Sequence, residues 1–259
     1  MANILETLGL CKEFRGFRAV DDVSLRVREG DIHALIGPNG AGKTTVFNLL
    51  TKFLPPSAGR IVFDGRDITG KKPAELARQG LVRSFQISAT FPHLTVLENV
   101  RVALQRRLAP TYAFWLSGST LSRLNGRALE LLEQVDMQDF AKVKAADLPY
   151  GRKRSVEIAT TLAMEPRLML LDEPTQGMGH EDVERVTQLI KRVSAGRTIL
   201  MVEHNMSVVA GICDRISVLQ RGALLAEGSY AEVSRNPQVL EAYMGSSDLG
   251  EAALGGGQA

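Results

Sequence analysis

The sequence has 259 residues, of which 44% are hydrophobic and 23% charged, the composition of an ordinary globular protein with a large core. Its formal net charge of +2 is too small to predict binding to nucleic acid or to an anionic membrane surface. No basic segment followed by an apolar stretch opens the chain, and no run of about 18 apolar residues occurs, so the sequence predicts neither a signal peptide nor a membrane span.

The first third of the chain predicts short strands. Residues 23–27 alternate between apolar and polar side chains, and residues 32–36 form a compact apolar run. A further strand at 61–63 is followed by Asp64 and Gly65, a pair typical of a hairpin turn.

The remainder of the chain alternates helices with buried strands. Apolar residues recur at helical spacing over 96–104 and over 129–135. Between these helices, residues 107–126 contain Pro, Gly, Ser and the single tryptophan, which indicates a local insertion. Continuous apolar runs at 168–171 and 198–202 predict parallel strands buried on both faces. The sequence therefore predicts an α/β fold.

A glycine-rich segment directly after the strand at 32–36 fits the pattern of a phosphate-binding loop. Its glycines let successive backbone N–H groups point at one anion, and the following helix adds its positive N-terminal end. The lysine is expected to reach the β- and γ-phosphates of a nucleotide and the threonine hydroxyl to bind Mg²⁺. The loop comprises Gly37, Pro38, Asn39, Gly40, Ala41, Gly42, Lys43 and Thr44, and the predicted helix continues with Thr45.

Two adjacent acids end the strand at 168–171. Because an apolar strand holds its last residue rigidly, Asp172 is predicted to bind the magnesium shell beside the phosphate loop. Glu173 is predicted to project toward the attacking water as a general base. Together with the phosphate loop, this pair predicts an ATP-hydrolysing site with ATP and Mg²⁺ as cofactors.

Further residues make the chain similar to the ATP-binding-cassette family. Gln86, in Arg-Ser-Phe-Gln, resembles the family glutamine that senses Mg²⁺ and water, and His204 resembles the switch histidine that contacts the γ-phosphate. Phe14 lies where the family places an aromatic ring under adenine, although the nearby Phe17 leaves open that Phe14 belongs to the core. The resemblance implies a mixed-sheet core, an antiparallel β subdomain and an inserted helical subdomain.

Within that family, the chain resembles the ATPases of branched-chain amino-acid importers. The insertion at 107–126, the segment 203–209 and the ending at 236–245 resemble that branch. The ending is shared with ATPases of lipopolysaccharide export, which lack the insertion. A non-transport cassette ATPase and a regulatory subunit without turnover are further alternatives.

One segment departs from the family pattern. The family binds ATP between two subunits, and the second subunit supplies a signature, Leu-Ser-Gly-Gly-Gln. The matching residues are Leu148, Pro149, Tyr150, Gly151 and Arg152. The proline loses a hydroxyl and a backbone N–H that would face the γ-phosphate. The arginine supplies compensating charge or belongs, with Lys153 and Arg154, to a solvated basic face.

A second departure follows the acidic pair. Gly179 stands where the family carries Asp or Asn, and His180 either substitutes for it or, the favoured reading, is an idle surface residue. Both departures lie in segments that this chain would contribute to the ATP site of a partner subunit, whereas the residues predicted for its own ATP site follow the family pattern. We therefore predict a heterodimer with a second cassette ATPase, in preference to a homodimer.

The resemblance also implies the organisation and partners. An ATP-binding core is expected at 1–91 and 165–245, a helical subdomain at 92–164, and a disordered tail at 246–259. The expected partners are two integral membrane permease subunits and, indirectly, a periplasmic substrate-binding protein, but no nucleic acid. The protein is expected at the cytoplasmic face of the inner membrane. Cys11 and Cys213 are interpreted as reduced thiols that fill the core.

Overall fold

The computed structural model describes residues 2–84, 90–105 and 123–244. Its centre is a six-stranded sheet with the order β11-β10-β4-β9-β8-β7. The strands pair in parallel except β11, which runs antiparallel to β10 at one edge. The strands are β4 (Ile32–Ile36), β7 (Leu81–Arg83), β8 (Leu168–Asp172), β9 (Thr198–Val202), β10 (Arg215–Gln220) and β11 (Ala223–Gly228). The predicted buried strands are confirmed by β4, β8 and β9.

A second, antiparallel sheet has the order β2-β1-β5-β6, with β3 paired to β1. Its strands are β1 (Asn3–Phe14), β2 (Phe17–Val23), β3 (Arg26–Arg28), β5 (Ala58–Phe63) and β6 (Arg66–Asp67). The turn between β5 and β6 is confirmed, with positive φ values of 51° at Asp64 and 70° at Gly65.

The prediction of one strand over 23–27 is wrong, because the chain breaks between β2 and β3. At the break, the side chain of Thr7 takes the place of the backbone hydrogen bonds of a continuous strand. The Oγ1 of Thr7 donates a hydrogen bond to the Val23 carbonyl at 2.7 Å and accepts one from the Leu25 N–H at 2.8 Å. Apolar alternation alone does not reveal a partner that is distant in the sequence.

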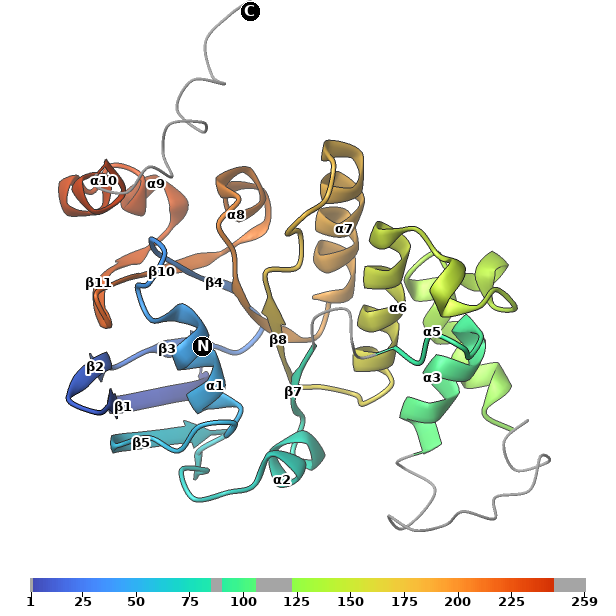
Figure 1. Cartoon of the computed structure of the whole chain (residues 1–259), viewed down its shortest axis with the longest axis horizontal. Helices are drawn as coiled ribbons and strands as arrows, with labels where there is room; N and C mark the ends of the chain where they lie inside the picture. Colours follow the sequence, from blue (N-terminus) through green and yellow to red (C-terminus); the bar gives the residue numbers. More distant parts are fainter. Residues whose placement is uncertain (1, 85–89, 106–122, 245–259) are drawn as a thin grey trace, which may run out of the picture.

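The helices cover both faces of the central sheet (Figure 1). Helix α1 lies between the two sheets, α7 and α8 flank the other side, and α3, α5 and α6 gather at one end of the molecule. The α-helices are α1 (Lys43–Leu50), α2 (Pro73–Arg78), α3 (Val96–Gln105), α5 (Asn125–Gln134), α6 (Tyr150–Leu162), α7 (His180–Val193), α8 (Met206–Ile212), α9 (Tyr230–Val233) and α10 (Pro237–Met244). Two 3-10 helices, η1 (Gln138–Phe140) and η2 (Ala145–Asp147), precede α6. The predicted helices at 96–104 and 129–135 correspond to α3 and α5.

The hydrophobic core consists of two clusters, one on each face of the central sheet. Alternate residues of one strand enter different clusters: Met169 and Leu171 of β8 pack with the helices α3, α5, α6 and α7, whereas Leu168 and Leu170 pack with α1 and the antiparallel sheet. This burial on both faces explains the continuous apolar runs in the sequence. It also fixes the carboxyl end of each parallel strand.

Several other predictions can be placed. Of the insertion at 107–126, only 123–126 fall among the described residues, and the tail at 246–259 falls outside them. Cys213 packs against the core, and burial raises the pKa of its thiol to about 12. Both cysteines are half-buried, but Cys11 is not among the residues packed against the core and its Sγ accepts a hydrogen bond from the Asp22 N–H at 3.3 Å, so packing against the core describes Cys213 alone.

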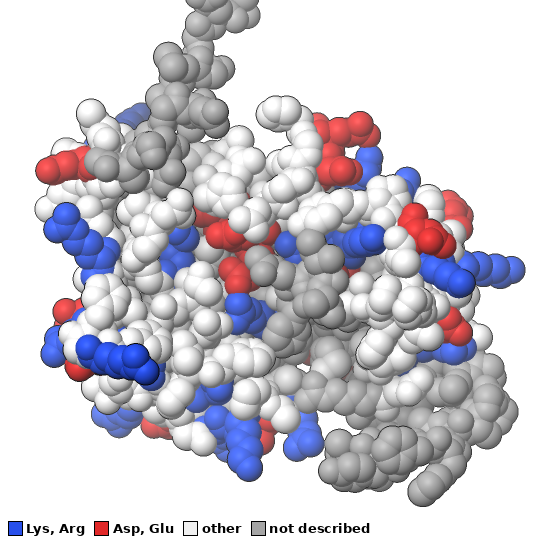
Figure 2. Space-filling view, in the orientation of Figure 1, with Lys and Arg blue, Asp and Glu red and all other residues white. Residues whose placement is uncertain are grey.

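The helices of the described segments are all too short or too polar to cross a membrane. Basic and acidic side chains are interspersed over the face shown in Figure 2, in keeping with the small net charge.

Candidate functional site

The glycine-rich loop joins β4 to α1, as the sequence predicts. Gly37 has a φ of 148°, and a Cβ there would lie 2.1 Å from the Leu219 carbonyl oxygen. Gly42 has a φ of 102°, and a Cβ there would lie 2.6 Å from the Ala19 carbonyl oxygen. Both positions therefore require glycine for conformation and for space.

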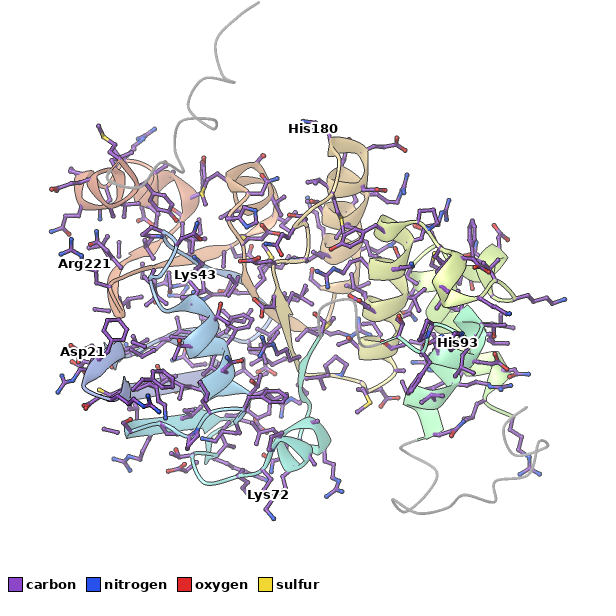
Figure 3. All side chains as sticks on the ribbon, viewed as in Figure 1. Asp21, Lys43, Lys72, His93, His180 and Arg221 are labelled. Carbon is purple, nitrogen blue, oxygen red and sulfur yellow. The ribbon has the colours of Figure 1, made fainter. Side chains whose placement is uncertain are left out.

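The lysine of the loop is folded onto its own backbone. Lys43 is buried, and its Nζ donates hydrogen bonds to the carbonyl oxygens of Gly37 at 2.6 Å and Pro38 at 3.1 Å. Figure 3 shows it at the start of α1, beside the central sheet. The first N–H groups of a helix have no intrahelical acceptor. The loop therefore brings backbone N–H donors and the Lys43 ammonium together at the N-terminus of α1, where an anion can bind. Thr44 is exposed there, Asn39 and Gly40 are exposed, and Thr45 is half-buried.

The acidic pair lies at the end of β8. Asp172 is 8% exposed and accepts a hydrogen bond from Arg83, whose guanidinium also donates to the Asn48 Oδ1 at 2.7 Å. Glu173 is half-buried and has a positive φ of 44°, and its N–H donates to the Val202 carbonyl at 3.0 Å. The strand therefore ends at Asp172, and the backbone leaves the extended conformation at Glu173.

The loop after β9 carries the predicted histidine. His204 is exposed, whereas the preceding Glu203 is fully buried. The carboxylate of Glu203 accepts hydrogen bonds from the backbone N–H groups of His204 at 3.0 Å and Asn205 at 3.1 Å. Because β4, β9 and β8 are adjacent parallel strands, the phosphate loop, His204 and the acidic pair follow one edge of the sheet. This is the edge at which open α/β sheets bind ligands.

The signature segment begins α6. Leu148 is buried, Pro149 is the exposed N-cap residue, and the Tyr150 hydroxyl donates to the Gln176 carbonyl at 3.2 Å. Gly151 is buried where α6 approaches α7. The Arg152 guanidinium lies 3.9 Å from the centroid of the Phe140 ring, a cation–π contact.

Arg154 was not singled out as a functional residue by the sequence. The solvated-face alternative for the basic run is wrong at this position, because Arg154 is only 4% exposed. Its guanidinium donates to the carbonyl oxygens of Glu173 at 3.0 Å and Pro174 at 3.1 Å, and to the Glu157 Oε2 at 2.7 Å. It thus joins the signature helix to the backbone of the acidic pair.

The aromatic and loop residues complete the predicted set. Phe14 is 42% exposed at the tip of the β1–β2 hairpin, so the alternative that it belongs to the core is wrong. Gly179 and His180 are exposed at the start of α7, and Figure 3 shows His180 at the far end of that helix from the sheet. Gln86 lies outside the described residues.

A cation at this site would depend on the nucleotide for most of its ligands. Among the described residues no three His, Cys, Asp or Glu side chains come together as a metal cluster. Mg²⁺ commonly takes one or two protein oxygens together with phosphate oxygens and water. The Thr44 hydroxyl and the Asp172 carboxylate suit that chemistry, and the glycine cradle suits the phosphates. The fold and site define a phosphate-loop ATPase.

Comparisons with known proteins agree. Residues 20–176 match the model of the ABC transporter family, and residues 223–248 match that of the branched-chain amino acid ATP-binding cassette transporter. The chain is 39% identical to BraF of Pseudomonas aeruginosa, a high-affinity branched-chain amino acid transport ATP-binding protein, over 93% of this chain and 98% of the relative. LivG of Escherichia coli K12, with the same description, is 37% identical over 93% of this chain and 98% of its own length.

Solved structures show the same architecture. The ADP conformation of an ATP-binding cassette of an ABC transporter superposes on this chain with a TM-score of 0.83 and 31% sequence identity. The superposition covers 95% of this chain and 100% of that structure. A nucleotide-free ATP-binding cassette from an ABC transporter superposes with a TM-score of 0.82 and 31% sequence identity, over 93% of this chain and 99% of that structure. The chain belongs to the ABC transporter family, and it is an ATPase of that family.

Proposed function

We propose that the chain is the ATP-hydrolysing subunit of a membrane importer for branched-chain amino acids or a related small amphipathic solute. The observation that carries this proposal is the match of the C-terminal segment, residues 223–248, to the branched-chain cassette model. That segment includes β11, α9 and α10, which lie outside the residues matched to the general family model. The names of BraF and LivG support the same substrate class.

The ATP site is proposed to use the residues at the carboxyl edge of the sheet. The loop from Gly37 to Thr45 surrounds the phosphates and, apart from Pro38, which has no N–H, donates to them through its backbone N–H groups together with the Lys43 ammonium, and Phe14 stacks on adenine. Mg²⁺, when bound, neutralises phosphate charge, and Thr44, Gln86 and Asp172 are the residues that would hold its shell. Glu173 accepts the proton of the attacking water and His204 contacts the γ-phosphate.

The second proposal concerns the dimer. The signature at 148–152 faces the nucleotide of a second cassette ATPase, in a heterodimer with unequal sites. This is supported by Pro149 at the N-cap of α6, since proline supplies neither a side-chain hydroxyl nor an N–H. The guanidinium of Arg152 contacts Phe140 instead of extending beyond the helix N-terminus, so no compensating charge is proposed for it.

The chain is proposed to work at the cytoplasmic face of the inner membrane, held by two permease subunits that receive solute from a periplasmic binding protein. A core at 1–91 and 165–245 and a helical subdomain at 92–164 are proposed to move as rigid bodies when ATP closes the site. The Gln86 loop and residues 91–102 are proposed to contact the permeases. The exposure of Phe91, 52%, supports this contact.

Affinity purification of the tagged chain from native membranes tests the assembly. The expected result is co-purification of two polytopic membrane proteins and a second cassette ATPase, identified by mass spectrometry. Recovery of the chain alone, or with ribosomal proteins, would refute the importer proposal while leaving the ATPase assignment intact.

A substitution pair tests the unequal sites in the purified complex. Glu173→Gln in this chain is expected to lower ATP turnover by about 10²-fold or more, because it removes the general base. The matching substitution in the second ATPase is expected to lower turnover much less. Equal losses would show that the two sites are equivalent.

A further inference from the structure

A cavity of about 330 Å³ lies between α6, α7 and residues 135–140, which follow α5. Figure 1 shows α6 and α7 side by side. The volume is at the lower end of the roughly 300–1,000 Å³ that small-molecule sites occupy. Arg152, the last residue of the signature segment, lines the cavity, whereas the residues proposed to bind this chain's own ATP do not line it.

Two of the three arginines that line the cavity are already paired with acids. The Arg192 guanidinium donates to the Asp136 carboxylate at 2.6 Å. Arg185 donates to Glu181 and Asp182, both at 2.8 Å. A multiply charged anion would have to break these pairs in order to use their charge. The described residues of the cavity therefore do not form the cluster of unpaired cations that a phosphate ester or a nucleotide requires.

The third guanidinium is unpaired. Arg152 is half-buried, and its guanidinium lies 3.9 Å from the centroid of the Phe140 ring. Within the described part of the chain, this guanidinium forms no ion pair with a carboxylate. A guanidinium on an aromatic face keeps the N–H groups at its edge available, and this edge matches the two oxygens of a carboxylate. The cavity thus offers one unpaired cation with a preference for a planar, singly charged group.

A buried hydroxyl lies one helical turn from this arginine. Ser155 is 4% exposed and also lines the cavity. Among the residues that the structure describes, its hydroxyl has no hydrogen-bond partner. Residues three apart on a helix lie about 5–6 Å from each other, so Ser155 and Arg152 can bind the same small group. A ligand oxygen would satisfy a hydroxyl that is otherwise buried without a partner, which is costly.

An unpaired carboxylate stands on the exposed side of the cavity. Asp139 lines it and is exposed, and within the described ranges its carboxylate has neither an ion pair nor a hydrogen bond. The charges of Asp139 and Arg152 sum to zero. A ligand with one ammonium and one carboxylate keeps the sum at zero, whereas a plain carboxylate would face Asp139 with a charge of the same sign.

We propose that this cavity binds a zwitterionic α-amino acid with a small apolar side chain. Its carboxylate binds the Arg152 guanidinium and the Ser155 hydroxyl, and its ammonium faces Asp139. The apolar residues Val135, Met137 and Leu189 also line the cavity and suit the side chain of such a ligand. The inference goes beyond the proposed function, because it stands on the unpaired groups of the cavity and not on the import reaction.

Ligand-observed NMR titration of the purified full chain tests this chemistry with three matched probes. Leucine carries both charged groups, isocaproate lacks the ammonium, and leucinamide lacks the carboxylate. We expect leucine to bind saturably and isocaproate to bind about two- to fivefold more weakly, the effect of losing one exposed ion pair. Leucinamide should bind about tenfold more weakly or worse, because it loses the charged partner of Arg152. Inorganic phosphate at the same concentration should not displace leucine.

Three substitutions then test the named groups. Arg152→Gln should weaken leucine binding about tenfold or more, and Ser155→Ala about two- to tenfold. Asp139→Asn should abolish the preference for leucine over isocaproate, a change of selectivity that partial unfolding does not produce. Arg66→Gln on β6 and Glu241→Gln on α10 are exposed controls outside the cavity and should keep the wild-type affinity. Thermal unfolding of each purified variant checks that it folds.

Several outcomes would overturn the inference. They are the lack of saturable leucine binding, equal affinity for leucine and isocaproate in wild type, and displacement of leucine by phosphate. Leucine affinities within twofold of wild type for both Arg152→Gln and Ser155→Ala would do the same. None of these measurements involves the membrane partners, so a failure here leaves the proposed function standing, and a failure of the co-purification leaves this site standing.

Discussion

The Glu203 carboxylate accepts two hydrogen bonds from Thr175, one from its hydroxyl at 2.6 Å and one from its backbone N–H at 3.1 Å. The other carboxylate oxygen accepts the N–H groups of the loop that carries His204. One fully buried side chain thus joins the segment after Glu173 to the segment after β9. The loop that follows the proposed general base and the loop that carries the proposed γ-phosphate histidine are therefore held together through one buried carboxylate.

Glu203→Gln is predicted to weaken this connection. A carboxylate offers acceptors on both oxygens, whereas an amide turns an NH₂ group toward N–H donors on one side. The expected loss is about 1–3 kcal/mol in the free energy of unfolding, measured by urea denaturation. ATP turnover should fall while the dissociation constant for ATP changes little, because the phosphate loop is not touched. Glu184→Gln, at an exposed position of α7, serves as the control. A large loss of ATP affinity with normal turnover would contradict this role for Glu203.

Lys43→Met is predicted to weaken ATP binding about 10- to 100-fold, because one cation that bonds to phosphate is lost. In the structure this ammonium is bound to two carbonyl oxygens of its own loop, so it is already placed at the cradle. Fluorescent-nucleotide titration measures the affinity. Lys72→Met is the matched control, since Lys72 is exposed on the outer edge near α2 and is labelled far from Lys43 in Figure 3. Equal effects of the two substitutions would exclude a specific role for Lys43.

The sequence predicted the elements whose pattern is local. The runs at 168–171 and 198–202 are buried strands because both faces of the sheet are covered, and the glycine-rich loop follows β4 because its pattern includes its own strand and helix. The positions of Asp172 and His204 follow from where strands end. The family resemblance added the signature segment, which no local pattern identifies.

The sequence could not reveal residues whose role depends on distant partners. Arg154 is one of three consecutive basic residues, and only the fold shows that its acceptors lie on the loop after β8. Glu203 gave a weak signal, a charged residue directly after an apolar strand, but its four donors come from two different loops. The break between β2 and β3 depends likewise on the Thr7 side chain.

Gly37→Ala and Gly40→Ala are predicted to differ in stability. Both positions have positive φ, 148° and 78°, but a Cβ at Gly37 would overlap the Leu219 carbonyl oxygen at 2.1 Å, whereas a Cβ at Gly40 meets nothing within 4 Å. Gly40→Ala should cost about 1 kcal/mol through backbone strain alone, and Gly37→Ala about 2 kcal/mol or more. Urea unfolding midpoints at a common m-value measure the difference. Gly40→Ala as the more destabilising change would refute the close approach of β10 to the loop.

A buried histidine predicts how stability depends on pH. His33 of β4 is fully buried, and its Nε2 is hydrogen bonded to the Ser217 Oγ at 2.8 Å. Burial lowers the pKa of His33 from 6.5 to about 4, because the charged imidazolium loses its hydration. The unfolded chain then binds a proton that the folded chain does not bind between these two values. The contribution of His33 to the free energy of unfolding is therefore fully present above pH 6.5, and it is lost progressively as the pH falls toward 4.

The free energy of unfolding is predicted to be about 2 kcal/mol lower at pH 5 than at pH 7.5 on account of His33 alone. Urea denaturation at the two pH values measures the difference in wild type and in His33→Gln. The glutamine variant cannot bind the proton, so its stability should lack this part of the decrease even if the variant is less stable at pH 7.5. His180→Gln, at an exposed position of α7, should keep the wild-type dependence. An unchanged decrease in His33→Gln would assign the acid sensitivity to the carboxylates, since their protonation is the other source of instability as the pH falls.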